Sequence, residues 1–241
     1  MEEGNIGLYK GVVVKAGSLI GSYAKSVFRS LFWRTDPMQE MKINEEQRDA
    51  LQEMANIGAG NASTALSQMV NKKIQMGIPK AELINLEDVT NHIEKGQVVV
   101  GIYLRISDEI PSYVMLLIPR DSAFSIADML LQRESDSSVE VLSEMDKSAL
   151  NEVGNVMICA FFDSLSELFQ MSIVPGPPKL AYDIPDAIID YILIQIGQVA
   201  NQVLFFNVDL KDEDKEGFKI DMFLLPEPQS IDTILEKLGV K

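Results

Sequence analysis

The chain of 241 residues has little of the chemistry that many enzymes use, because it contains one cysteine, Cys159, and one histidine, His92. A single cysteine cannot form an internal disulfide, and one histidine cannot build a His-rich zinc site. The composition therefore argues against zinc hydrolases, Ser-His-Asp triads and Cys-His nucleophiles. Carboxylate, amide and hydroxyl groups remain as the candidate chemistry, and Cys159 is expected to be a small core residue.

Positive charge and long apolar runs are also scarce. The 21 basic residues face 36 acidic residues, and a net charge of −15 repels the phosphates of nucleic acids, so we expect no nucleic-acid partner. The longest apolar runs, residues 98–104 and 113–119, are far shorter than the roughly 20 residues that span a bilayer. Glu2 and Glu3 stand where a secretion signal would be cationic, so we expect a cytoplasmic protein.

The first 36 residues differ from the rest in charge. They hold five basic and three acidic residues, a net charge of +2, which leaves −17 on the remaining 205 residues. Apolar residues recur at helical spacing between Leu19 and Phe32, which predicts a basic amphipathic helix within an N-terminal extension of residues 1–40. Three fates are open for this helix: packing on the acidic body, contact with a membrane surface or a partner, or disorder. We expect packing on the body.

From Asn44 onward, a pattern of a long helix, short strands and a short helix occurs twice. In the first round we expect a helix over 44–70, strands near 74–83, 97–106 and 112–119, and a short amphipathic helix after residue 119. In the second round we expect a helix over 143–170, a strand near 173–182, strands near 202–209 and 217–225, and a helix over 230–238. Between them lies an apolar segment, 185–197, that could be either a helix or a strand.

The repetition extends to residue identity. A shift of 99 residues places residues 49–80 on 148–179 with ten identities in thirty-two positions, where average residue usage gives roughly two. We therefore expect one domain, residues 41–241, made of two repeats over 41–135 and 140–241. Three strands with a helix on one side leave an edge unpaired. The predicted fold is α+β, in which two pseudo-symmetric repeats share an antiparallel sheet of about six strands with the two long helices on one side.

Each long helix combines a predicted buried stripe with a polar face. The stripes consist of Leu51, Ala55, Gly58, Ala62, Leu66 and Met69 in the first helix, and of Leu150, Gly154, Met157, Phe161, Leu165 and Leu168 in the second. Off the stripe, Asp49, Glu53 and Asn56 share one face of the first helix, and the second helix repeats the arrangement with Ser148, Glu152 and Asn155.

The repeated asparagine points to function, because Asn is a poor helix former in mid-helix. Identity by descent without present function is the alternative. A carboxamide both donates and accepts hydrogen bonds, so it can orient a water molecule. If a partner brings an activated phosphoryl group with its Mg²⁺, orienting that water supplies much of the remaining catalysis. A glutamate one turn away could pair with a lysine of the partner.

These residues resemble the signature of the CheC/CheX/FliY phosphatases of chemotaxis, and of CheC in particular. The signature consists of Asp or Ser, three residues, Glu, two residues, Asn, twenty-two residues and Pro. It occurs twice in the sequence, as Asp49, Glu53, Asn56 and Pro79, and as Ser148, Glu152, Asn155 and Pro178. The resemblance covers about residues 41–240.

The resemblance implies hydrolysis of the aspartyl phosphate of a CheY-type response regulator, with Glu53, Asn56, Glu152 and Asn155 as the catalytic residues. It implies that Mg²⁺ is bound by the regulator, so that this chain needs no cofactor of its own, and that the deamidase CheD is a second partner. Asp49 and Ser148 are expected at the partner interface, with Pro79 and Pro178 as structural parts of the motif.

Arg48 and Lys147 precede the two motifs at corresponding positions. They either contact an acidic regulator or carry ordinary helix-surface charge. The alternative function is that of a non-catalytic CheC-like adaptor, which binds CheD or a flagellar-switch component.

Overall fold

The computed structural model describes residues 42–93, 97–134, 141–196, 202–212, 217–227 and 229–241. The predicted amphipathic helix of the N-terminal extension lies outside these residues. Within the described part of the chain, no helix is long and apolar enough to cross a membrane.

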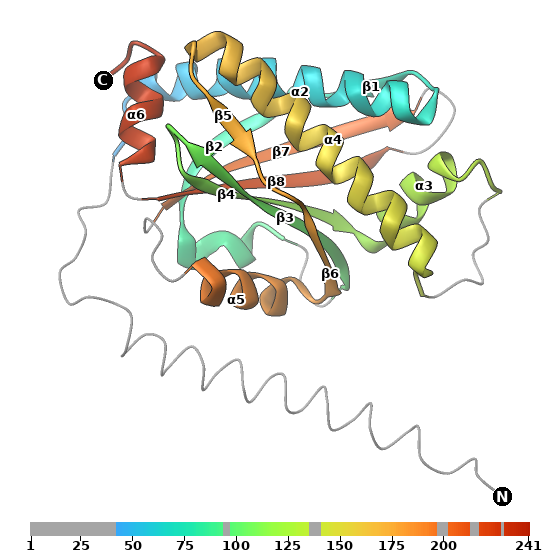
Figure 1. Cartoon of the computed structure of the whole chain (residues 1–241). Helices are drawn as coiled ribbons and strands as arrows, with labels where there is room; N and C mark the ends of the chain where they lie inside the picture. Colours follow the sequence, from blue (N-terminus) through green and yellow to red (C-terminus); the bar gives the residue numbers. More distant parts are fainter. Residues whose placement is uncertain (1–41, 94–96, 135–140, 197–201, 213–216, 228) are drawn as a thin grey trace, which may run out of the picture.

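Two antiparallel hairpins form the centre of one sheet (Figure 1). Strands β3 (Val99–Asp108) and β4 (Ser112–Pro119) make the first hairpin, and β7 (Gln202–Asp212) and β8 (Phe218–Pro226) make the second. Strand β4 pairs antiparallel with β8, so the two hairpins lie side by side.

Two short strands line each edge of this sheet. Strands β1 (Ile74–Met76) and β2 (Lys80–Asn85) both pair with β7, whereas β5 (Ile173–Pro175) and β6 (Lys179–Asp183) both pair with β3. The eight described strands therefore occupy six positions, which agrees with the predicted number. Each repeat supplies the edge strands of the hairpin that the other repeat forms.

The two long helices, α2 (Glu45–Val70) and α4 (Glu144–Phe169), lie together on one face of the sheet (Figure 1). Each begins with a capping box, in which the side chain of Asn44 or Ser143 accepts a hydrogen bond from the backbone N–H three residues later. Each ends at a residue in the left-handed conformation, Asn71 or Gln170. The α+β class and the common side of the two helices are confirmed.

Shorter helices complete the fold. Helices α3 (Arg120–Leu130) and α6 (Ser230–Lys237) lie near the ends of the long helices. The 3-10 helix η1 (Leu86–Asn91) and helix α5 (Pro185–Ile196) lie on the opposite face, where a second apolar cluster forms. Of the apolar segment 185–197, whose type the sequence leaves open, residues 185–196 form helix α5, which starts at a proline, the residue that the first helical position favours.

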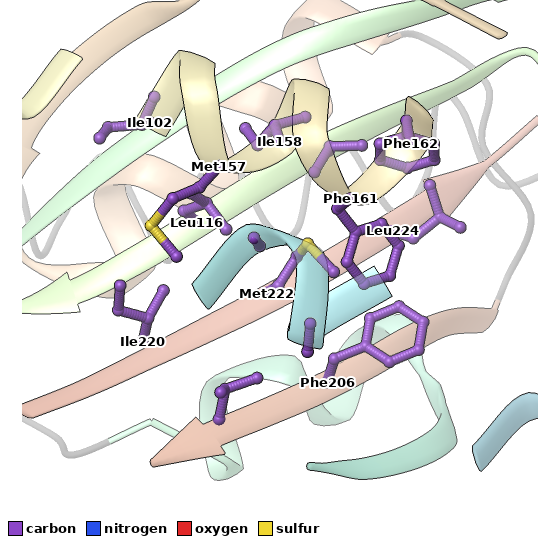
Figure 2. Packing of buried hydrophobic residues seen from close by; sticks show 14 of the residues in the cluster. Ile102, Leu116, Met157, Ile158, Phe161, Phe162, Phe206, Ile220, Met222 and Leu224 are labelled. Carbon is purple, nitrogen blue, oxygen red and sulfur yellow. The ribbon is translucent and has the colours of Figure 1, made fainter. Parts of the chain in front are cut away.

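The main core lies between the long helices and the sheet. Phe161 of α4 contacts the ring of Phe206 of β7 with 5.7 Å between centroids, and Met157 faces the sheet beside Leu116 and Met222 (Figure 2). The predicted stripes are buried or packed on this core with one exception: Leu168 is 46% exposed. The stripe continues from Leu165 to Phe169, four residues on, because that step keeps the buried face aligned over the last turn.

Candidate functional site

The first motif lies on the exposed side of α2. Asp49 and Glu53 are exposed, and Asn56 is half-buried one turn further along the helix. The Nδ2 group of Asn56 donates a hydrogen bond to Oε2 of Glu53 at 3.3 Å. The structure therefore brings together the acid and the amide of this motif on the surface of the helix.

Gln52 joins this pair to the proline of the motif. Its Nε2 group donates to the Pro79 carbonyl oxygen at 2.5 Å and to Oδ1 of Asn56 at 3.3 Å. Its Oε1 atom accepts a hydrogen bond from the Ala81 backbone N–H at 3.1 Å. Gln52 thus holds the buried Pro79 and the start of β2 against α2. Neither the repeat nor the helical periodicity of the sequence singles out Gln52.

The second motif repeats the layout with different contacts. Ser148 and Glu152 are exposed and Asn155 is half-buried. The Oδ1 atom of Asn155 lies 3.7 Å from Sγ of Cys159, which is the donor of a weak hydrogen bond. Cys159 was expected in the core, but it is only half-buried because a residue four positions after Asn155 shares its helix face.

The thiol of Cys159 remains protonated at neutral pH, as a donor must. Burial raises its pKa above the ordinary value, and the charges of Asp163 and Glu152 raise it further. A protonated thiol is a poor nucleophile. The cysteine is therefore a neighbour of Asn155 that donates a hydrogen bond.

The loop before each motif proline is tied to the hairpin of the other repeat. Gly77 N–H donates to the Asp209 carbonyl oxygen of β7, and Gly176 N–H donates to the Arg105 carbonyl oxygen of β3, both at 2.8 Å. Between Gly77 and Pro79, the side chain of Ile78 is 87% exposed. Ile78 precedes Pro79, whose carbonyl oxygen accepts a hydrogen bond from Gln52, so this exposed aliphatic side chain is a candidate for contact with a partner. It lies in a loop, where helical periodicity gives no signal.

The remaining predicted residues border the motifs. Arg48 is exposed on the first turn of α2. Lys147 forms an ion pair with Glu144 at 2.7 Å, so its ammonium group already has an acidic partner within α4. Pro178 is half-buried, in contrast to the buried Pro79.

No metal site accompanies these groups in the part of the chain that the structure describes. His, Cys, Asp and Glu side chains do not gather there in groups of three that could hold an ion. The cavity beneath α2 and α4 is about 30 Å³ and is lined mainly by apolar side chains such as Ala59, Met157 and Met222 (Figure 2). It is a packing gap, with room for about one water molecule.

The chain, which displays an acid and an amide at the same place on its two long helices, is similar to proteins of the CheC-like family. A family model described as the CheC-like family matches residues 46–82. The X-ray structure of Thermotoga maritima FliY superposes with a TM-score of 0.68 at 20% identity, covering 83% of this chain and 98% of that chain.

Two sequence relatives agree with this similarity. The chain is 29% identical over 201 residues to the protein named CheY-P phosphatase CheC of Bacillus subtilis (strain 168), covering 82% of this chain and 96% of that protein. It is 26% identical over 138 residues to the flagellar motor switch phosphatase FliY of the same organism, covering 57% of this chain and 36% of that protein. The predicted resemblance to the CheC/CheX/FliY family is confirmed.

Proposed function

We propose that this chain is a protein-aspartyl-phosphate phosphatase that acts on a CheY-type response regulator in the cytoplasm. The observation that carries the proposal is the surface pair of Glu53 and Asn56, repeated by Glu152 and Asn155 on the second helix. The names of the Bacillus subtilis relatives, a CheY-P phosphatase and a motor switch phosphatase, support the substrate class.

In this mechanism the asparagine positions the attacking water. Oδ1 of Asn56 accepts a hydrogen bond from Gln52, and Nδ2 donates one to Glu53. One lone pair and one N–H of the carboxamide are left for water. The regulator supplies the phosphoryl group and the Mg²⁺ that neutralises its charge, so an oriented, in-line water completes the reaction.

The glutamates dock the partner. Glu53 and Glu152 are exposed one helical turn before each asparagine, where a lysine at the regulator's active site can approach them. Asp49 and Ser148, with Arg48 and Lys147 beside them, extend this contact toward the start of each helix. A macromolecular substrate suits the geometry, because both pairs project from a surface.

The proposal is tested with Asn56→Ala and Asn155→Ala in one chain. Replacing the two half-buried asparagines by alanine leaves the helices intact, since alanine is the better helix former. We expect stimulated phosphate release from a phosphorylated regulator to fall by about 10²-fold or more, the usual loss when a positioned catalytic group is removed. Phosphate release is followed in single turnovers after the regulator is phosphorylated with a small-molecule donor.

Asn61→Ala is the matched control. Asn61 is exposed on α2, and its side chain donates to the Ile57 carbonyl oxygen on a different face of the helix. This variant should retain full activity. If the folded double variant is as active as the parent, the chain is not a phosphatase of this mechanism, and binding of CheD or of a flagellar-switch component becomes the function to measure.

A further inference from the structure

The two sites hold their asparagines in different ways. Gln52 uses both hydrogens of its amide group, one for Oδ1 of Asn56 and one for the Pro79 carbonyl, while its oxygen accepts from Ala81 N–H. With Glu53 on Nδ2, the carboxamide of Asn56 is fixed at both ends. A side chain held at both ends loses little further freedom when it binds water and substrate.

The second site lacks this arrangement. The residue that corresponds to Gln52 is Asn151, whose side chain is shorter by one methylene group. Among the described residues, the Oδ1 atom of Asn151 is buried without a hydrogen-bond partner. Asn155 instead accepts from the thiol of Cys159 at 3.7 Å, a weaker donor than an amide N–H.

We propose that Gln52 is a positioning residue of the first site, which fixes the Asn56 carboxamide and ties it to the Pro79 loop. The inference rests on the proposed phosphatase function and adds a residue outside the family signature. A consequence is that the first site is the more preorganised of the two and catalyses faster per site.

The test measures the effect of substitutions at Gln52 in a chain that carries Asn155→Ala. That substitution removes the second site, so only the first site contributes to the measured rate. Gln52→Glu keeps the length of the side chain and the acceptor for Ala81 N–H, but it has no N–H for Pro79 or Asn56. Gln52→Met keeps the length without either polar atom. Gln68→Glu makes the same chemical change at an exposed position near the C-terminal end of α2 and is the control.

We expect kcat for phosphate release to fall about tenfold in Gln52→Glu and Gln52→Met, with KM for the phosphorylated regulator within about twofold of the parent. The ¹⁵N order parameter of the Asn56 side-chain amide should fall in the same variants. Both quantities should be unchanged in Gln68→Glu. A general loss of structure would instead lower the melting temperature and the order parameters along α2.

Three results would overturn the inference: an unchanged kcat in both Gln52 variants, a change confined to KM, or a chain with only the first site that is slower than one with only the second. If the unsubstituted chain does not accelerate phosphate release, the proposed function fails. The Asn56 order parameter then still decides whether Gln52 holds the carboxamide, and an unchanged value rejects the inference by itself.

Discussion

Gly58 and Gly60 lie two residues apart on α2 and have opposite surroundings. A Cβ atom at Gly58 would lie 2.5 Å from Cδ2 of Phe161 on α4, whereas a Cβ atom at Gly60 would meet no atom within 4 Å beyond its chain neighbours and the backbone of its own helix. The ring of Phe161 therefore packs into the space that a side chain at residue 58 would occupy. Gly154 plays the same part on α4, because a Cβ atom there would overlap Ile102 of β3.

This contrast predicts opposite effects of two alanine substitutions. Gly58→Ala should lower the free energy of unfolding by about 1 kcal/mol, because overpacking costs about 1–3 kcal/mol and exceeds the helix-propensity gain of about 1 kcal/mol. Gly60→Ala should raise it by up to about 1 kcal/mol, since it gains propensity without a clash. Urea unfolding followed by circular dichroism measures both. Equal midpoints for the two variants would contradict the packing described for Gly58.

At the residue scale, the sequence predicts some residues of the candidate site and not others. Glu53 and Asn56 are identifiable because their spacing and their repetition at residues 152 and 155 are properties of the chain itself. Gln52 is not, because two of its three hydrogen bonds, to Pro79 and Ala81, depend on where the loop from Gly77 to Pro79 passes α2. That position is set by pairing of β1 and β2 with β7, which no local pattern encodes.

Among the elements, the start of α4 is fixed by a buried carboxylate. Oδ2 of Asp146 accepts hydrogen bonds from the Ser143 N–H and hydroxyl, both at 2.8 Å. Its Oδ1 atom lies 2.7 Å from Nη2 of Arg133, which also pairs with Asp128 of α3 at 2.6 Å. Burial alone would raise the pKa of Asp146, but the hydrogen bonds from Ser143 and the charge of Arg133 outweigh it and lower the pKa.

The lowered pKa predicts a pH-dependent loss of stability. The ionised Asp146 stabilises the fold above the pKa of about 3.9 that an unfolded aspartate has, and this contribution is lost as pH falls through the lower folded-state value. Asp146→Asn should therefore cost about 2 kcal/mol at pH 7 and progressively less below about pH 4.

Unfolding in urea at several pH values measures this difference. Glu144→Gln is the control, because Glu144 is 91% exposed and a surface ion pair contributes little. A difference between Asp146→Asn and the parent that does not change with pH would contradict the assignment of the effect to the charge.

The residues at which the long helices start are predictable from the sequence because capping is local: Asn44 and Ser143 are the N-caps. The edge strands are less so, since the expected continuous strands near 74–83 and 173–182 are each two short strands. Pro79 and Pro178 lack the N–H that a continuous ladder would use, and the glycine two residues before each proline bonds to the neighbouring hairpin.

For the whole molecule, the exchange of edge strands makes the two repeats interdependent. Within the described sheet, strand pairs other than the two hairpins join one repeat to the other: β1 and β2 to β7, β4 to β8, and β5 and β6 to β3. The helices α2 and α4 share one core above them. Neither repeat can leave the sheet without breaking the strand pairs that it forms with the other repeat.

This interdependence predicts one unfolding transition for residues 41–241. Calorimetric and van't Hoff enthalpies should agree, and Gly58→Ala in the first repeat should shift the transition as a whole. Differential scanning calorimetry with circular dichroism at several wavelengths is the measurement. Two resolved transitions, of which Gly58→Ala moves only one, would mean that the repeats fold separately.

The loop of each site also depends on a strand made at a different time during synthesis. The chain leaves the ribosome N-terminus first. The second site's loop bonds to β3, which is already synthesised when Gly176 emerges, whereas Gly77 has to wait for Asp209 of β7. The site that the gene encodes first is therefore the one whose backbone partners are completed last.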